Sequence, residues 1–297
     1  MPYIKTYNKE IYYEIYGECN KNTLVYFHGG PGASCLDFAV QAKALGSKLK
    51  VIIFDQCGVL RSERIMENES YGMKIQVDMI EEMRKMLGIG KWSVLGHSYG
   101  GMLACLYAHV YPSSVDKLIL ECPSLDFADS AKSIAYYLSD YISESCGDEA
   151  KKLCEKIKIT EYTDKTSAFD LMSLLGYIQD TKLRNYLHGI SYEEYTKYTY
   201  SETITNEMWA KSETHLTKLL DEGKMFENFL PILNDLHKPL MLINGLYDPA
   251  CSKNQIRYIK ENVVTAKQVL FENSGHFPRI EEAAKYTQCV TDFLMGL

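Results

Sequence analysis

The first 121 residues alternate short apolar runs with longer amphipathic segments, and this pattern restricts the chain to few folds. Four runs have the length of buried strands: 24–27, 51–54, 92–95 and 115–121. The segments between them have a helical pattern and cover 36–45, 74–87 and 99–111. Strands that alternate with helices pack as a mainly parallel sheet with helices on both faces. The sequence therefore predicts an α/β fold, which opens with an antiparallel hairpin over residues 3–16.

A change of pattern after Pro123 indicates an insertion. Residues 124–236 contain no β-branched strand run, and their pattern is helical and rich in Tyr, Glu and Lys. A strand-like apolar run resumes at 240–243. A tandem second domain would not explain this return, whereas an insertion does. We therefore predict a core of residues 1–123 and 237–297 that carries a helical cap over 124–236.

Charge and hydrophobicity exclude several classes of partner. The chain has 39 acidic and 32 basic residues and a net charge of −7, which is unfavourable for nucleic acid. Its apolar runs are far shorter than the roughly 20 residues that cross a bilayer. Residues 1–5 lack the basic and apolar regions of a secretory signal. We expect a cytoplasmic protein that binds neither nucleic acid nor membrane.

The cysteines point to the same compartment. All 9 are scattered singly, without a Cys-x-x-Cys pair, and their odd number argues against a complete disulfide framework. No Cys/His cluster has the ligand spacing of a zinc site. We expect reduced thiols and no bound metal.

A serine between two glycines is the first candidate for chemistry. Residues 96–100 read Gly-His-Ser-Tyr-Gly and join the predicted strand 92–95 to the predicted helix 99–111. Glycine two positions before and after the serine removes the Cβ atoms that would collide in a sharp turn. Such a turn exposes the hydroxyl at the end of the strand, so we predict that Ser98 is a nucleophile.

A serine nucleophile needs a base and a carboxylate that orients it. Asp248 follows the predicted strand 240–243, and His276 follows another predicted strand at 268–271. The order Ser98, Asp248, His276 matches the order of triads built on this turn. Asp126, after an earlier strand, is a second candidate acid. His28 and His97 are interpreted as structural residues, because neither lies where the base is expected.

A tetrahedral intermediate also needs donors for its oxyanion. The backbone N–H of Tyr99, immediately after the nucleophile, is one candidate. The loop at 28–32 follows another strand and reads His-Gly-Gly-Pro-Gly. We predict that it supplies the second donor, and we favour Gly30 over Gly29.

Several of these segments together resemble the proline iminopeptidases, which are serine aminopeptidases of the α/β-hydrolase fold. The resemblance rests on His28-Gly29-Gly30-Pro31-Gly32, on Asp55-Gln56 followed by Gly58 and Arg61-Ser62, on the turn Gly96 to Gly101, and on Ser274-Gly275-His276. It implies a mostly parallel sheet flanked by helices, with an inserted cap. The chain has Cys57, Leu60 and Tyr99 where that family usually has Arg, Gly and Trp. These departures support the aminopeptidase class more than a strict preference for proline.

The resemblance also implies that carboxylates of the cap hold the free α-amino group of the substrate. Residues 209–213 are similar to a Trp-rich segment of the family that ends in Glu, and residues 226–228 are similar to another cap segment with a Glu. On this basis we nominate Glu213 and Glu227 as amine-binding residues. The alternative for each is a solvated position on a helix surface.

These observations lead to one principal hypothesis and two alternatives. The first is a serine aminopeptidase that releases proline or another small apolar residue from the N-terminus of short peptides, without a cofactor. The second is an esterase, lactonase or amino-acid amide hydrolase that uses the same triad. The third is a non-catalytic receptor for a small molecule that retains the pocket.

Overall fold

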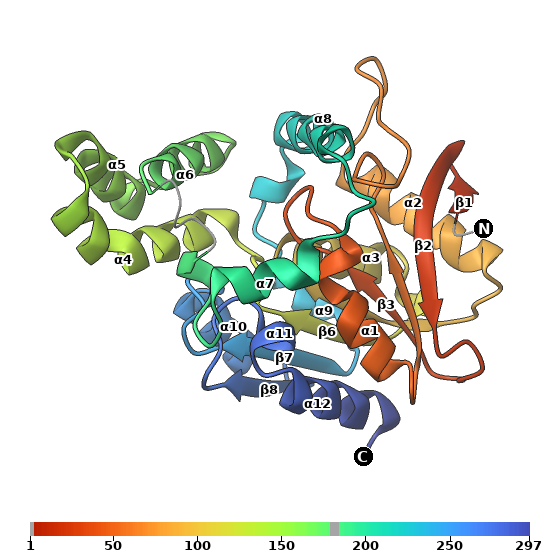
Figure 1. Cartoon of the computed structure of the whole chain (residues 1–297). Coiled ribbons are helices and arrows are strands. Elements are labelled where there is room, and N and C mark those ends of the chain that lie inside the picture. Colours follow the sequence, from red (N-terminus) through yellow and green to blue (C-terminus); the bar gives the residue numbers. More distant parts are fainter. Residues whose placement is uncertain (1–2, 179–183) are drawn as a thin grey trace.

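The computed structural model describes residues 3–178 and 184–297, and within them eight strands form one sheet (Figure 1). Their order across the sheet is β1-β2-β4-β3-β5-β6-β7-β8. The strands are β1 (Tyr3–Thr6), β2 (Lys9–Tyr16), β3 (Thr23–Phe27), β4 (Lys50–Phe54), β5 (Trp92–His97), β6 (Val115–Glu121), β7 (Leu240–Gly245) and β8 (Ala266–Phe271). β1 and β2 are antiparallel to their neighbours, whereas the strands from β3 to β8 are all parallel to one another. The predicted mainly parallel sheet is confirmed.

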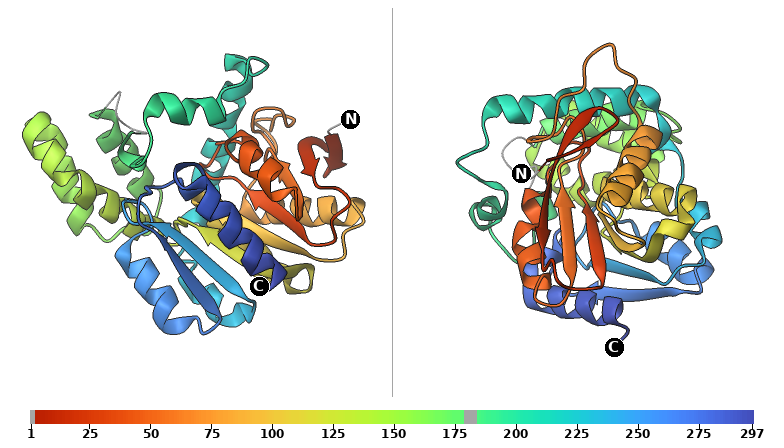
Figure 2. Two further views of the ribbon diagram at one scale, coloured as in Figure 1. Left: turned by 60° about the horizontal axis from the view of Figure 1, so that its bottom comes forward. Right: turned by 90° about the vertical axis from the view of Figure 1, so that its right-hand side faces the viewer.

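Helices cover both faces of the sheet, because successive strand residues point to opposite sides. Val25 and Phe27 of β3 belong to a core with α2 (Met73–Met86) and α3 (Tyr99–Val110). Leu24 and Tyr26 belong to a second core with α1 (Ala39–Leu45) and α12 (Ala283–Met295). In the right-hand view of Figure 2 these two helical layers lie on either side of the strands.

Between β6 and β7 the described residues form helices and contain no strand. The helices are α4 (Phe127–Ser145), α5 (Asp148–Ile159), α6 (Thr166–Gly176), α7 (Tyr192–Thr199), α8 (Asn206–Glu222) and α9 (Leu233–Leu236). The first three share a small apolar core of their own and form a lobe beside the sheet (Figure 1). α9 instead packs into the main core. The predicted cap of residues 124–236 stays a prediction. Its last helix, α9, packs with the core of the sheet and not with the lobe.

One predicted helix is divided in the structure. Residues 36–45 form a 3-10 turn, η1 (Cys35–Phe38), followed by α1. The hydroxyl of Ser34 accepts a hydrogen bond from Leu36 N and starts the turn. After the cap, α10 (Lys253–Asn262) precedes β8, and α11 (Pro278–Glu281) and α12 follow it. Across the described ranges, no helix has both the length and the apolar character needed to cross a membrane.

Candidate active site

Ser98 occupies a strained turn between β5 and α3. Its backbone has φ 55° and ψ −122°, a conformation that L residues rarely adopt. A Cβ on Gly96 would lie 2.2 Å from the carbonyl oxygen of Gly100, and a Cβ on Gly100 would lie 2.1 Å from the oxygen of Phe27. Ser98 N donates to Glu121 O at 3.1 Å, which holds the turn against β6. The glycines therefore make the turn possible, and the neighbouring strands maintain it.

Asp248 and His276 form a hydrogen-bonded pair. Nδ1 of His276 lies 2.8 Å from Oδ1 of Asp248, and both side chains are almost fully buried. The carboxylate also accepts hydrogen bonds from Ala250 N at 2.9 Å and Cys251 N at 3.2 Å. An ionised carboxylate fixes the proton on Nδ1, so Nε2 is left to accept a proton.

Ser98 and His276 line the same cavity, which has a volume of about 410 Å³ and which we call the Ser98 cavity. The structure thus brings together the three residues predicted as a triad. The alternative acid, Asp126, caps α4 instead, because its side chain accepts a hydrogen bond from Asp129 N at 3.0 Å. The geometry favours Asp248 over Asp126 as the partner of the histidine.

Cys122 adds a third donor beside this pair. Its Sγ, a carboxylate oxygen of Asp248 and a ring nitrogen of His276 all lie within 4.8 Å of one another. Burial raises the pKa of the Cys122 thiol well above its ordinary value, so the sulfur stays protonated at neutral pH. Metal ligation requires a thiolate. With a protonated thiol beside them, Asp248 and His276 are better suited to act as a buried acid–base pair than as ligands of a metal ion.

The two other histidines near Ser98 have structural partners. His97 donates from Nε2 to the backbone oxygen of His276 at 2.9 Å. His28 donates from Nδ1 to Gly29 O at 3.0 Å and accepts at Nε2 from Gln56 N at 3.0 Å. Burial lowers the pKa of both rings, so both are neutral at pH 7.

The glycine loop after β3 lies against the nucleophile. Gly29, Gly30 and Tyr99 all line the Ser98 cavity. A Cβ on Gly29 would lie 3.1 Å from Ser98 Cβ, whereas Gly30 has a positive φ of 116°. Both glycines therefore lie at the wall of the cavity that contains Ser98, and Gly30 stays our predicted donor together with Tyr99.

An ion pair that the sequence did not reveal stabilises this loop. Asp55 is fully buried and accepts hydrogen bonds from Ser34 Oγ at 2.6 Å and from Arg61 Nε at 2.6 Å. Gln56 Nε2 donates to the backbone oxygen of His28 at 2.9 Å. The Asp55-Gln56 motif was visible in the sequence, but nothing in the sequence shows that these residues contact the glycine loop at 28–32.

Arg61→Met is expected to destabilise the protein by about 3–5 kcal/mol, because it leaves the buried Asp55 carboxylate without its counterion. Burial alone would raise the pKa of Asp55, but the hydrogen bonds and charge of Arg61 lower it below 3.8. This stabilisation is present above pH 3.8 and is lost as the pH falls through the lowered value. Urea unfolding at pH 7 and at decreasing pH measures the effect.

The difference in the free energy of unfolding between wild type and Arg61→Met should therefore become smaller as the pH falls. Lys74→Met is a matched control, since Lys74 pairs with Asp78 at the surface. Its expected effect is at most about 0.5 kcal/mol. Equal effects of the two substitutions would contradict the role assigned to Asp55.

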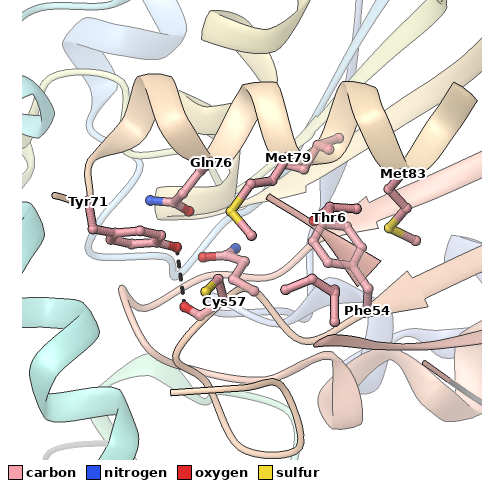
Figure 3. A pocket seen from close by; sticks show the side chains of 10 residues that line it. Thr6, Phe54, Cys57, Tyr71, Gln76, Met79 and Met83 are labelled. Atoms are coloured by element: carbon pink, nitrogen blue, oxygen red, sulfur yellow. Dashed lines mark hydrogen bonds between the residues drawn. The ribbon is translucent and has the colours of Figure 1, made fainter. Parts of the chain in front are cut away.

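The side chain of Tyr99 is held in place by a residue of α2. Gln76 Nε2 donates to the Tyr99 hydroxyl at 2.9 Å. Figure 3 shows Gln76, Met79 and Met83 of α2 above a small internal cavity, with Thr6 beneath the helix. That cavity has a volume of about 10 Å³, room for about one water molecule, so it is too small for a substrate.

The two nominated carboxylates do not line the Ser98 cavity. Glu213 is exposed on α8, whose contribution to the lining consists of Leu216 and Leu220. Glu227 is paired with Lys224 at 2.9 Å, and its side chain is 61% exposed in a different hollow. The structure therefore does not support either residue as an amine-binding group.

Most of the Ser98 cavity is apolar. Part of its lining comes from three helices: Phe127 and Ile134 of α4, Leu171 and Leu175 of α6, and Leu216 and Leu220 of α8. A cavity of this size and character is typical of a site for a small molecule with an apolar group.

Comparison with known proteins agrees with this geometry. The chain is 28% identical over 309 residues to the proline iminopeptidase of Clostridium botulinum, and the match covers 99% of this chain and 96% of the relative. The crystal structure of a proline iminopeptidase-related protein from Thermus thermophilus has a TM-score of 0.74 and 18% identity, with 99% and 96% of the two chains covered. The resemblance to proline iminopeptidases inferred from the motifs is confirmed.

Other hydrolases share the architecture. An esterase from Exiguobacterium antarcticum has a TM-score of 0.68 and 19% identity, with 99% and 98% of the two chains covered. Such identities show the fold alone. Residues 22–283 match the family model of the alpha/beta hydrolase fold. This range is most of the chain, and it includes Ser98, Asp248 and His276. The protein therefore belongs to the α/β hydrolase fold family.

Proposed function

We propose that the protein is a serine aminopeptidase that releases proline or another small apolar residue from the N-terminus of short peptides. The observation that carries this proposal is the hydrogen-bonded Asp248–His276 pair beside the strained turn of Ser98. The full-length similarity to a proline iminopeptidase supports the reaction class. The apolar lining of the Ser98 cavity supports an apolar residue in the position that is released.

The proposed reaction proceeds through an acyl-enzyme. Ser98 Oγ attacks the carbonyl carbon of the first peptide bond while His276 Nε2 takes the hydroxyl proton. Asp248 stabilises the imidazolium, and the amides of Gly30 and Tyr99 bind the oxyanion. The tetrahedral intermediate collapses, the C–N bond breaks, and His276 gives its proton to the leaving amine. Water then repeats the sequence at the ester and frees the amino acid.

An esterase or amide hydrolase is the second candidate. It is favoured by one observation, namely that neither Glu213 nor Glu227 lines the cavity. The same triad would cleave an ester without any group that recognises an amine. No cofactor is required in either reaction, and a cytoplasmic location stays a prediction.

The free amine of the substrate distinguishes the two candidates. The aminopeptidase should cleave the p-nitroanilides of proline and alanine, and acetylation of their amines should lower kcat/KM by about 10²-fold or more, because a charged contact is lost. Release of p-nitroaniline measures both rates. Rapid ester hydrolysis without cleavage of either free p-nitroanilide would contradict the proposal and identify an esterase.

A further inference from the structure

One carboxylate does line the Ser98 cavity. Asp37 is the only acidic side chain among the described residues of its wall. It lies in η1, directly after the glycine loop that faces the nucleophile. Its side chain is 7% exposed. Asp37 is therefore a carboxylate of the α/β core, not of the inserted helices, that a ligand beside Ser98 can reach.

Asp37 belongs to a buried cluster of charged side chains around Arg279. Arg279 is fully buried and pairs with Asp37 on one side and with Glu121, at 3.1 Å, on the other. One guanidinium thus lies between two carboxyl groups, and burial raises the pKa of Glu121. The buried His97 and His28 are neutral, because burial lowers the pKa of both rings. Arg279 thus faces two carboxyl groups, so the cluster has no excess positive charge that would repel an ammonium group beside Asp37.

The carboxylate is held in place but retains acceptor capacity. The hydroxyl of Tyr26 donates to Oδ1 at 3.1 Å, and Arg279 Nη2 donates to Oδ2. An ionised carboxylate has about four lone-pair positions, so about two are still available. A fixed, partly satisfied anion is a better ligand for an ammonium group than a mobile surface glutamate, because it need not be ordered on binding.

An aminopeptidase needs an anion in the same cavity as its nucleophile. The α-nitrogen of an N-terminal residue is about 2.5 Å from the carbonyl carbon that Ser98 attacks, since only one carbon separates them. The ammonium group must therefore enter the cavity next to the triad. Without a counterion there, its desolvation would be costly.

We propose that Asp37 binds the protonated α-amino group of the substrate and so selects unblocked N-terminal residues. This inference rests on the proposed function and replaces the role expected for Glu213 and Glu227. Arg279 and Tyr26 act as positioning residues that hold the carboxylate toward the cavity.

A pair of esters tests the inference separately from peptidase activity. The p-nitrophenyl ester of leucine carries the amine, and the p-nitrophenyl ester of 4-methylpentanoate lacks it but is otherwise the same. The ratio of their kcat/KM values measures recognition of the amine. Asp37→Asn should lower this ratio by about 10- to 100-fold, because a charge-assisted hydrogen bond is lost.

Glu121→Gln is the matched control. It removes the other carboxylate from the same arginine, but Glu121 does not line the cavity. Its ratio should stay within about twofold of wild type. A ratio unchanged by Asp37→Asn, or lowered equally by both substitutions, would overturn the inference. If the amine ratio falls as expected while the p-nitroanilides are not cleaved, Asp37 binds the amine and only the proposed peptidase activity fails.

The wild-type protein offers a second measurement in case Asp37→Asn does not fold. An α-amino group titrates at about pH 7.7–8.0. The ratio should be highest below about pH 7 and fall toward one as the substrate ammonium loses its proton. A wild-type ratio near one at about pH 6.5 would show that no anion selects the amine and would overturn the inference directly.

Discussion

Ser98→Ala is expected to lower kcat for an alanine p-nitroanilide by about 10⁴- to 10⁶-fold, because it removes the atom that forms the acyl-enzyme. Asp248→Asn should lower kcat by about 10⁴-fold, since an amide can hold His276 in the wrong tautomer. Thermal unfolding should show that both variants are folded. Initial rates of p-nitroaniline release measure the losses.

Asp126→Asn is the control for these substitutions. Asp126 also follows a strand of the sheet, but it caps α4, and asparagine is an equally good cap. The variant should have wild-type activity. Loss of activity in Asp126→Asn together with retention in Asp248→Asn would show that the acid of the triad has been assigned to the wrong residue.

Gly100→Ala should have the largest effect on stability. The added Cβ would lie 2.1 Å from Phe27 O and 2.8 Å from His28 O, both of which are backbone atoms. Relief of this overlap requires α3 to move away from β3, or the paired strands to shift. We expect a loss of more than about 4 kcal/mol, the range of severe core defects. Urea unfolding monitored by circular dichroism measures it.

Gly90→Ala provides the comparison. Gly90 is exposed, and a Cβ there would have no neighbour within 4 Å. Its substitution should change the free energy of unfolding by no more than about 0.5 kcal/mol. Similar stabilities of the two variants would mean that the turn at Ser98 tolerates a side chain, contrary to the packing described above.

The sheet was predictable because its strands are short, apolar and separated by clear turns. In a parallel sheet the carboxyl ends of the strands meet at one edge. This rule placed Asp248 and His276 near each other although neither lies near Ser98 in the sequence. The chain order of the triad and the pair of glycines around Ser98 added the remaining constraints.

The positions of Glu213 and Glu227 relative to the cavity could not be predicted in the same way. Helical spacing places Glu213 on the same stripe of α8 as Leu216 and Leu220, but it does not tell where the cavity ends. The structure shows that the cavity stops before Glu213. Periodicity therefore predicts which face of a helix a residue occupies, but not whether the residue lies near enough to the cavity to line it.

The cluster around Asp37 was also invisible to sequence analysis. Its partner Arg279 is 242 residues away, and Glu121 belongs to a strand that reads as an ordinary apolar run. A buried ion pair of this kind has no local pattern, because its members are brought together only by the sheet topology. The same reason hid the link between Asp55 and the glycine loop.

Reaction with a fluorophosphonate probe tests the central claim most directly, because such a probe modifies an activated serine. Mass spectrometry of the labelled wild-type protein should find one adduct, and digestion should locate it on Ser98. Ser98→Ala should not be labelled. The absence of an adduct from folded wild-type protein, or an adduct on a residue other than Ser98, would contradict the assignment of Ser98 as the nucleophile.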